Sequence, residues 1–583
     1  MSPAGGKGRP SLVPKTPEAP TISFGDLLEE VGSMGLFQFF SVLLLSLPVL
    51  LLASHNLVQN FSAASPEHRC RLSPSTNASG GHPVPLDQSQ LPDRCRRFVH
   101  RMVLDPNGSL DKDRGAETEP CHDGWLYDNS TFASTIVTEW DLVCNLQPLK
   151  NLAQSLFMAG MLVGAFIFGD LSDRFGRRLI LIWSLLLVAV MGSGAALSAS
   201  FAAYCVFRFL SGVGISGFLL NYICLSLEWV PTRHRAIVIA TQSYCSTAGQ
   251  VLLAGLAYGI RDWRWLQLAI SAPFFCFFAY SWWLPESARW LLANNKHEAA
   301  LCNLKRVAKI NGKAATGDTV FLEVSGAPSD LCLLHGSAPA AGLMLETQVG
   351  SKTSGRGAHS CLDLFRTPAL RRISCCLMFI SFSMNMAYFG LSMDLSMFGL
   401  NIFLMQLFFG SIDLLAKMGC ALLLTFFGRR TIQATSLVLA GAFLLVTLPV
   451  PPEMLLVRMA LVVLGKGCLA ASSMCLYLYG GELFPTVIRQ TGTSFVTAMS
   501  RLGGIVAPMV LLAGGYQPSL PLLVFGIAPI ISGISAGFLP EMLQVPLMDT
   551  IEQVEERASW KSKAILEEKP GKIMVHVIRS TYF

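Results

Sequence analysis

Charged side chains are scarce in this sequence. Aspartate, glutamate, lysine and arginine together make up 14% of its 583 residues, whereas hydrophobic residues make up 52%. A soluble domain carries about 25% charged residues. The deficit therefore excludes a soluble protein and indicates a chain that is embedded in a lipid bilayer.

Several chemical signatures are also missing. The lysines and arginines lie mostly in loops, and with a net charge of only +6 they form no basic patch for nucleic acid. The cysteines show no zinc-binding spacing, so we expect no metal site. Because we find no nucleophile–base set and no phosphate-binding loop, we expect no catalytic residue, no cofactor and no enzymatic activity.

What the sequence does contain is a series of apolar runs, each long enough to cross a bilayer as a helix. The runs lie near 36–59, 150–170, 178–199, 202–227, 236–260, 264–284, 373–395, 400–426, 431–450, 454–479, 491–515 and 518–539. We predict an all-α membrane protein with 12 transmembrane helices in two six-helix bundles, at 36–284 and 373–539. A polar loop at 60–149 interrupts the first bundle, and a second loop at 285–372 joins the two.

The two ends of the chain are expected on the same side of the membrane. Residues 1–35 show no cleavable signal, so we expect the first apolar run to act as a signal-anchor. Short arginine-rich loops lie on the side of the termini, which the positive-inside rule makes cytoplasmic. The segment 1–35, the loop 285–372 and the tail 540–583 are therefore expected in the cytoplasm, and the loop 60–149 outside the cell.

The outer loop at 60–149 holds four cysteines and three Asn-x-Ser/Thr sequons. The cysteines are Cys70, Cys95, Cys121 and Cys144, and the sequons begin at Asn77, Asn107 and Asn129. Outside the cell, cysteines form disulfides and sequons carry glycans. We predict a disulfide-bonded, glycosylated cap, and all three pairings of the four cysteines remain open.

The two halves of the chain repeat each other. Glu228–Arg235 matches Glu482–Arg489 as E-x-x-P-T-x-x-R, 254 residues later. The Phe-Gly-Arg-Arg turn that ends at Arg178 recurs at Arg430, 252 residues later. Such offsets indicate a parallel repeat with equivalent loops on the same side. Two bundles of this kind can rock about a central site, which favours a transporter over a receptor or a membrane enzyme.

Charged groups in these loops can form a latch on the cytoplasmic face. We expect salt bridges among them to hold the outward-open state and to break in the inward-open state, and helix capping alone is the alternative. The candidate gating residues are Asp170, Asp173, Arg174, Arg177, Glu228, Arg235, Glu482 and Arg489.

Arg501 lies near the middle of the apolar run at 491–515. An arginine at that depth costs roughly 2.5–3.5 kcal/mol on insertion scales, and no acid occurs between Glu482 and Glu541. The helical stripe that contains Arg501 is otherwise small and polar. We interpret Arg501 as a fixed positive charge that faces a wet cavity and attracts an anion. Pairing with an acid on another helix is the alternative.

Three further cations lie in apolar runs. Lys417 follows Asp413 by four residues, a spacing that allows an intrahelical ion pair. Lys466 is either a second cavity charge or a side chain that snorkels to the interface, and we favour the cavity. Arg208 is expected to pair between helices.

Several motifs resemble those of a known family. GDLSDRFGRR at Gly169–Arg178 is the loop signature of the major facilitator superfamily, whose fold it implies. The large sequon-bearing loop, Pro285–Trp290 and Glu482–Gly492 resemble the organic ion transporters of the solute carriers. The resemblance to the organic anion transporter branch of that solute carrier organic ion transporter family rests on Phe24–Leu28, Gly35–Gln38 and Asn60–Ala64. It covers nearly the whole chain.

The resemblance implies a plasma-membrane transporter of aromatic or amphipathic organic anions. It implies alternating-access exchange against an intracellular dicarboxylate or another anion. In the anion branch a lysine at Lys417 and an arginine at Arg501 are linked to anion binding, whereas the related cation transporters typically carry an acid where Arg501 stands. A urate or monocarboxylate exchanger, an organic cation or zwitterion carrier, and a non-transporting receptor or scaffold remain alternatives.

The resemblance and helical spacing together suggest which residues line the substrate pocket. In the family the Tyr388–Phe389 position is usually two tyrosines and contributes to the drug pocket, and Ser473 and Tyr477 stand where bulky aromatics are frequent. Aromatic walls with a few cations suit planar aromatic carboxylates. The predicted substrate-binding residues are Arg501, Lys417, Tyr388, Phe389, Asn56, Ser473, Tyr477, Lys466 and Tyr244.

Two segments that are expected in the cytoplasm have features of their own. Residues 312–360 are rich in glycine, alanine and serine where family members usually carry a charged helical stretch, so we expect disorder there. The C-terminal Thr581–Phe583 has a hydroxyl residue and a terminal apolar residue, which suits strand addition to the groove of a PDZ-domain protein.

Overall fold

The computed structural model divides the chain into two compact units. The smaller unit comprises Met1–Val42, Leu225–Ala236 and Glu286–Arg356, and the larger unit comprises Leu43–Cys224, Ile237–Pro285 and Gly357–Phe583. Within these bounds the structure describes residues 28, 32–71, 94–98, 118–231, 234–294, 296–313, 363–393, 401–451, 453–485, 488–515, 517–543, 548 and 550–557.

The smaller unit contains two short helices, α11 (Ala288–Ala293) and α12 (His297–Ile310). Asn311 follows α12 directly. Its side-chain oxygen accepts a hydrogen bond from the backbone N–H of Phe37 at 3.0 Å, and its amide nitrogen donates to the side-chain oxygen of Gln38 at 3.0 Å. These two bonds tie the end of α12 to a segment of the unit that is more than 270 residues away in sequence.

The larger unit holds most of the helices in two sets, one from each half of the chain. The first set comprises α2 (Leu36–Leu57, from Leu43 on), α3 (Gln59–Ser62), α4 (Ile136–Glu139), α5 (Gln147–Phe175), α6 (Arg177–Ala196), α7 (Phe201–Glu228, to Cys224), α8 (Arg235–Gly259, from Ile237), α9 (Trp263–Ser271) and α10 (Pro273–Ser281). The second set comprises α15 (Asp363–Arg366), α16 (Pro368–Met393), α17 (Ile402–Phe426), α18 (Arg429–Val446), α19 (Leu455–Leu483), α20 (Arg489–Ala513) and α21 (Leu520–Ala536).

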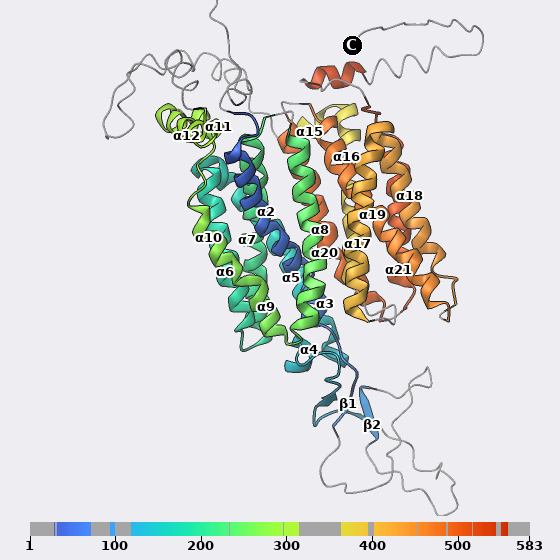
Figure 1. The fold of residues 1–583 in the computed structure, drawn as a ribbon. Coiled ribbons are helices and arrows are strands. Elements are labelled where there is room, and N and C mark those ends of the chain that lie inside the picture. Colours follow the sequence, from blue (N-terminus) through green and yellow to red (C-terminus); the bar gives the residue numbers. More distant parts are fainter. Residues whose placement is uncertain are drawn as a thin grey trace, which may run out of the picture. The chain divides into compact units, whose positions relative to one another are not determined.

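Helices α16 to α21 pack against one another over most of their lengths (Figure 1). Their shared core contains fully buried aliphatic and aromatic side chains, among them Leu377, Leu437, Leu469 and Phe525. Among the described residues, eight helices are long and apolar enough to cross a membrane, and α21 is a shorter apolar helix. The second set is therefore a helical bundle with its own apolar interior.

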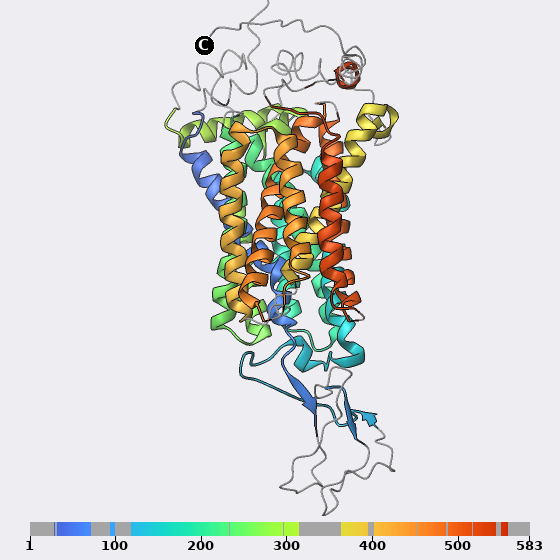
Figure 2. The same cartoon turned by 90° about the vertical axis from the view of Figure 1, so that its right-hand side faces the viewer.

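Four short strands lie between α3 and α5 in the sequence. The labelled strands β1 and β2 lie beyond the ends of the helices in Figure 1, and the turned view of Figure 2 agrees. Strand β1 (His68–Cys70) pairs antiparallel with β4 (Trp125–Tyr127), and β2 (Arg96–Phe98) pairs antiparallel with β3 (Thr118–Pro120). Of the three pairings that the sequence left open, the structure has the disulfides Cys70–Cys121 and Cys95–Cys144. His68 lies near Cys95 and Cys144, but the two sulfurs are bonded to each other, so this cluster does not offer a pair of thiolates to a metal.

One of the three predicted glycosylation sites lies in the described part of this loop. Asn129 is exposed just after β4, whereas Asn77 and Asn107 fall outside the described residues. The backbone N–H and hydroxyl of Ser130 donate to the Asp128 carboxylate at 3.0 and 2.8 Å, and these bonds lower the pKa of Asp128. Asn129 therefore sits on a small hydrogen-bonded turn that faces solvent.

Two expected helices are broken. The run near 264–284, predicted as one helix, forms α9 and α10 instead, because Pro273 has no N–H to donate and its ring clashes with the preceding turn. The first run likewise ends as α2 at Leu57 and resumes as the short α3 at Gln59. The run near 264–284 is therefore not one regular helix, whereas Leu36–Ser62 still forms a single 27-residue span that is long and apolar enough to cross a membrane.

The predicted loop at 285–372 also differs from the structure. It contains α11, α12 and α15, and α16 begins at Pro368 rather than at 373. Proline suits the first turn of a helix because its missing N–H would have no intrahelical partner there. Most of the divergent segment 312–360 lies outside the described residues.

Close helix packing in the first half depends on glycine at position 160. A Cβ added to Gly160 in α5 would overlap the backbone carbonyl oxygen of Phe209 in α7. Gly160→Ala should therefore push the two helices apart and destabilise the protein by about 1–3 kcal/mol, as overpacking does. Thermal unfolding of the purified protein measures this. Gly255→Ala in α8 is the matched control, because a Cβ there meets no atom within 4 Å; equal losses in both variants would contradict the packing argument.

Candidate functional site

Arg501 lies in α20 without an acidic partner. Its guanidinium Nη1 donates to the Sδ of Met161 in α5 at 3.7 Å, and the phenols of Tyr222 in α7 and Tyr477 in α19 lie within electrostatic range. No carboxylate of the described residues forms an ion pair with Arg501. A desolvated cation without a counter-ion is costly. The side chain is therefore suited to bind an anion that comes from outside the protein.

The surroundings of Arg501 come from both halves of the chain. Helix α5 packs against α20, and the hydroxyl of Ser155 donates to the backbone carbonyl of Ile505 at 3.2 Å. One turn after Arg501, a Cβ on Gly504 would lie in ordinary contact with Met158 and Phe389. Met158 of α5 and Phe389 of α16 therefore lie beside α20 one turn after Arg501.

Lys417 is a second cation at the contact between the halves. It lies in α17, is 9% exposed, and donates from Nζ to the Thr247 hydroxyl of α8 at 2.8 Å. The intrahelical pair with Asp413 that the spacing allows does not form: among the described residues Lys417 has no ion-pair partner. Its side chain extends toward α8, whereas Asp413 faces a neighbouring helix of its own bundle.

Lys466 in α19 is the cation that neutralises Asp413. Its Nζ lies 3.1 Å from Asp413 Oδ2, and both side chains are fully buried. The ammonium also lies over the rings of Tyr388 and Phe409, 4.4 and 4.9 Å from their centroids. Lys466 therefore neither reaches a membrane interface nor lies free in a cavity. The expectation of a free cavity charge there is corrected, because the carboxylate and two aromatic faces enclose it.

Tyr388 in α16 links this ion pair to the other half. Its hydroxyl donates to Asp413 Oδ2 at 2.5 Å and accepts from the side-chain amide of Gln250 in α8 at 3.0 Å. The ring of Phe389 meets the ring of Tyr388 edge-on, with centroids 5.6 Å apart. The Tyr388 hydroxyl therefore donates its one hydrogen bond to Asp413 and has none left for a ligand. The predicted Tyr388–Phe389 pair presents ring surface rather than a free hydrogen-bond donor.

The other predicted lining residues have less defined roles. Tyr244 in α8 is half-buried, and the Ser473 hydroxyl donates to the Ala470 carbonyl of its own helix at 2.7 Å. Tyr477 is 67% exposed. The backbone carbonyl of Asn56 accepts from Gln154 at 3.1 Å, while its side-chain oxygen has no hydrogen-bond partner among the described residues. Tyr477 is the member of this group that the structure places near Arg501.

Arg208 explains the break between α2 and α3. Its two terminal nitrogens donate to the backbone carbonyl of His55, both at 3.3 Å, and one also donates to the side chain of Gln154 at 3.2 Å. The guanidinium stacks on Phe157, 4.1 Å from the ring centroid. A cation at the C-terminal end of a helix compensates its unpaired carbonyls. The predicted interhelical partner of Arg208 is thus a helix end, not an acid.

Several of the candidate gating residues form ion pairs at the loops. Asp170 pairs with Arg174 at 3.0 Å and Asp173 with Arg177 at 2.8 Å, each four residues apart. In the second half Glu482 of α19 pairs at 3.2 Å with Arg429 of α18. The side chains of Arg235 and Arg489 each donate to a backbone carbonyl five residues earlier, on Val230 and Phe484.

Sequence reasoning missed several residues of these networks. Thr247 and Gln250 each bond a partner more than 130 positions away, so no local spacing marks them. The carboxylate of Glu541 accepts the backbone N–H groups of Arg429 and Arg430 at 2.8 and 3.2 Å and so caps α18. Glu541 stands 255 residues after Glu286, an offset close to those of the other repeats, and this offset was the available signal.

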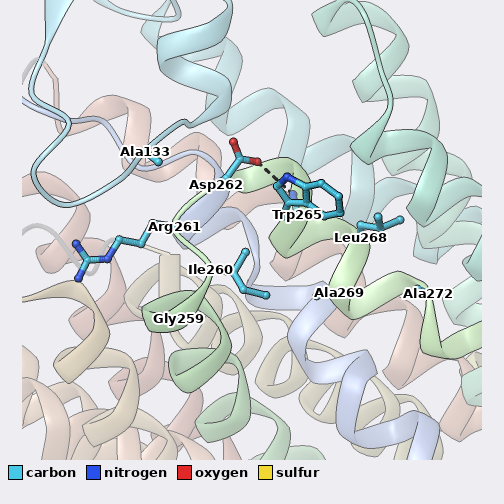
Figure 3. A pocket seen from close by; sticks show the side chains of 9 residues that line it. All are labelled: Ala133, Gly259, Ile260, Arg261, Asp262, Trp265, Leu268, Ala269 and Ala272. Atoms are coloured by element: carbon cyan, nitrogen blue, oxygen red, sulfur yellow. Dashed lines mark hydrogen bonds between the residues drawn. The ribbon is translucent and has the colours of Figure 1, made fainter.

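A surface hollow near the start of α9 lies apart from these residues (Figure 3). It is lined by Ala133, Gly259, Ile260, Arg261, Asp262, Trp265, Leu268, Ala269 and Ala272. Asp262 caps α9 by accepting the backbone N–H groups of Arg264 and Trp265 at 2.9 and 3.2 Å. Because none of the predicted substrate-binding residues lines the hollow, it is not the predicted substrate site.

The fold and the two-bundle site define a membrane transporter. Residues 147–508 match the family model described as Major Facilitator Superfamily, and the chain belongs to that superfamily. In solved structures, the inward-open xylose transporter XylE from E. coli superposes with a TM-score of 0.58 at 15% identity, covering 89% of this chain and 99% of that one. The D-xylose–proton symporter gives 0.53 at 14% identity, covering 88% and 100%. These likenesses show the fold.

Sequence relatives place the chain more narrowly, in solute carrier family 22. Solute carrier family 22 member 6-B of Xenopus laevis is 48% identical, over 92% of this chain and 95% of the relative. Organic anion transporter 3 of Homo sapiens is 47% identical, over 93% and 95%. The chain is thus a transporter and not an enzyme, and the family name expected from the motifs is corrected to solute carrier family 22.

Proposed function

We propose that this protein transports small organic anions across the plasma membrane by alternating access. The observation that carries the proposal is the partly buried Arg501 guanidinium, which has no carboxylate partner among the described residues and is surrounded by side chains of both halves. Lys417 supports it as a second cation that forms no ion pair among the described residues. Three relatives are named organic anion transporter 3, which agrees with a cargo of this charge.

The cargo that this chemistry favours is an aromatic or amphipathic carboxylate. The cations orient the negative group, and the aromatic rings of Tyr388, Phe389 and Tyr477 offer apolar area. Lys466 is excluded from direct anion binding in this arrangement because Asp413 already neutralises it. Asn56, Tyr244 and Ser473 stay candidate lining residues.

Exchange against an intracellular anion is the proposed mode of transport. Preloading cells with a membrane-impermeant dicarboxylate should accelerate the initial uptake of a labelled aromatic carboxylate, because a loaded carrier returns faster than one whose binding cations are empty. Initial rates with and without preloading measure this. Uptake that is independent of the internal anion would instead indicate a uniporter.

Two other substrate classes and one non-transport function are the alternatives. A urate or monocarboxylate exchanger would prefer those anions over larger aromatic ones, and a cation or zwitterion carrier would be inhibited by tetraethylammonium-like rather than para-aminohippurate-like compounds. A receptor or scaffold would bind ligand without accumulating it in sealed vesicles. The positive charges of Arg501 and Lys417, neither of which forms an ion pair within the described part of the chain, favour anion transport over cation transport.

We also propose that the loop ion pairs act as a latch on the cytoplasmic side, where both termini would lie. Asp173→Asn removes the pair with Arg177 and should raise the accessibility of cysteines placed in the inward-facing path. Cysteine labelling in membranes measures this shift. Asp128→Asn, in the strand-bearing loop, is the control. Unchanged labelling in Asp173→Asn would favour a helix-capping role instead.

A PDZ-domain protein is the proposed partner of the C-terminal Thr581–Phe583, which lies outside the described residues. Recognition would use strand addition and capture of the terminal carboxylate. Binding of a tail peptide to a panel of PDZ domains tests it, and a peptide extended by one glycine should lose the binding.

A further inference from the structure

The buried charges of the second bundle do not balance. Helices α17 and α19 contribute two buried ammonium groups, Lys417 and Lys466, and one buried carboxylate, Asp413. One carboxylate can neutralise one of the two lysines. The lysine that does not pair with Asp413 keeps its positive charge.

Helical spacing alone would predict an ion pair between Asp413 and Lys417. Asp413 and Lys417 are four residues apart on α17, the spacing at which an acid and a base on one helix face each other. The structure does not have this pair. Asp413 Oδ2 lies 3.1 Å from Lys466 Nζ of α19 and accepts the Tyr388 hydroxyl at 2.5 Å.

Asp413 nevertheless keeps the capacity to bind a second donor. Its Oδ1 is buried and has no hydrogen-bond partner among the described residues. Lys417 meanwhile donates to the neutral hydroxyl of Thr247 in the other half. Rotation of the Asp413 side chain toward its own helix would bring this unbonded oxygen toward the Lys417 ammonium, whose described hydrogen bond goes to a neutral hydroxyl.

We propose that Lys466 is a positioning residue that holds Asp413 away from Lys417 and so keeps the Lys417 charge available to the transported anion. Lys466 does not touch the anion itself, because the carboxylate and the rings of Tyr388 and Phe409 enclose its ammonium. The inference rests on the proposed anion transport and adds a residue that acts through another.

The proposal predicts that removing the Asp413 carboxylate restores the transport that is lost when Lys466 is replaced. In Lys466→Met the freed carboxylate pairs with Lys417, and the KM for a labelled aromatic carboxylate should rise at least about tenfold, as loss of a charged hydrogen bond does. In the double variant Lys466→Met with Asp413→Asn no carboxylate remains to neutralise Lys417. Its KM should return to within about threefold of the wild type, since neutral residues often replace a buried ion pair without harm.

The experiment uses full-length wild-type and variant proteins reconstituted in proteoliposomes, so that differences in trafficking to the cell surface do not affect the measured transport. Gln433→Met is the control for an apolar side chain in this core, because it removes a buried hydrogen bond to Ser472 without changing charge; its KM should match the wild type. A double variant that transports no better than Lys466→Met overturns the proposal, and so does a Lys466→Met protein with wild-type KM. If Lys466→Met does not fold, the double variant alone distinguishes the two roles of Lys466. If Lys466 bound the anion directly, the double variant would be defective in transport, whereas the positioning role predicts a KM near that of the wild type. Failure of the proposed function is distinct: the wild type itself would then accumulate no anion.

Discussion

Arg501→Ala is expected to lower the uptake of a small aromatic carboxylate by about tenfold to 150-fold. The guanidinium has no acidic partner among the described residues, so the incoming anion would supply its counter-charge. A hydrogen bond to a charged group contributes about 1.5–3 kcal/mol, and about 1.4 kcal/mol corresponds to a factor of ten. Initial uptake rates over a range of substrate concentrations, normalised to protein at the cell surface, measure the effect.

Two further substitutions give this prediction its controls. Arg501→Lys keeps the charge but loses the planar two-pronged donor, so its uptake should fall between those of the wild type and Arg501→Ala. Arg372→Ala removes an exposed arginine of α16 and should leave uptake unchanged. Wild-type uptake in Arg501→Ala would show that this guanidinium has only a structural role.

Lys417→Met should produce the second large loss, about tenfold or more in affinity for the same anion. The side chain is nearly buried, its described bond goes to a neutral hydroxyl, and among the described residues it forms no ion pair, so its charge is available to an anion. Methionine preserves much of the length and volume of the lysine while removing that charge. Competition of unlabelled anion against labelled substrate measures the affinity.

Thr247→Ala separates the charge of Lys417 from its placement. It removes the hydroxyl that accepts from Lys417 but leaves the ammonium in position to meet an anion. A neutral hydrogen bond contributes about 0.5–1.5 kcal/mol, so the loss of affinity should be smaller than in Lys417→Met. If Thr247→Ala is the more harmful of the two, the hydroxyl and not the lysine charge binds the cargo.

The isolated cations could be found from the sequence because a charge inside an apolar run is conspicuous. Arg501 stands in such a run, and the absence of a nearby acid in the chain pointed to its unpaired state in the structure. The partner of Asp413 could not be found in the same way. Spacing favours Lys417, whereas the choice of Lys466, 53 residues away, depends on how α16, α17 and α19 face one another.

Helix breaks illustrate a different limit. Pro273 is a visible signal, yet an apolar run of ordinary length conceals the division into α9 and α10. The break between α2 and α3 has no proline at the junction. It depends on Arg208, which lies 153 residues after His55 and accommodates the carbonyl oxygen that the break leaves free. Disulfide pairing in the strand-bearing loop is likewise a property of the folded chain, because it depends on which strands become neighbours.

Equilibrium binding of an aromatic carboxylate and of its neutral amide to purified wild-type and Arg501→Ala proteins tests the central claim most directly. The carboxylate should bind the wild type at least about tenfold more tightly than the variant, as expected for one charged hydrogen bond, while the amide should bind both proteins alike. Equal affinity of the carboxylate for the two proteins would contradict the account, because the guanidinium would then not interact with the negative charge of the cargo.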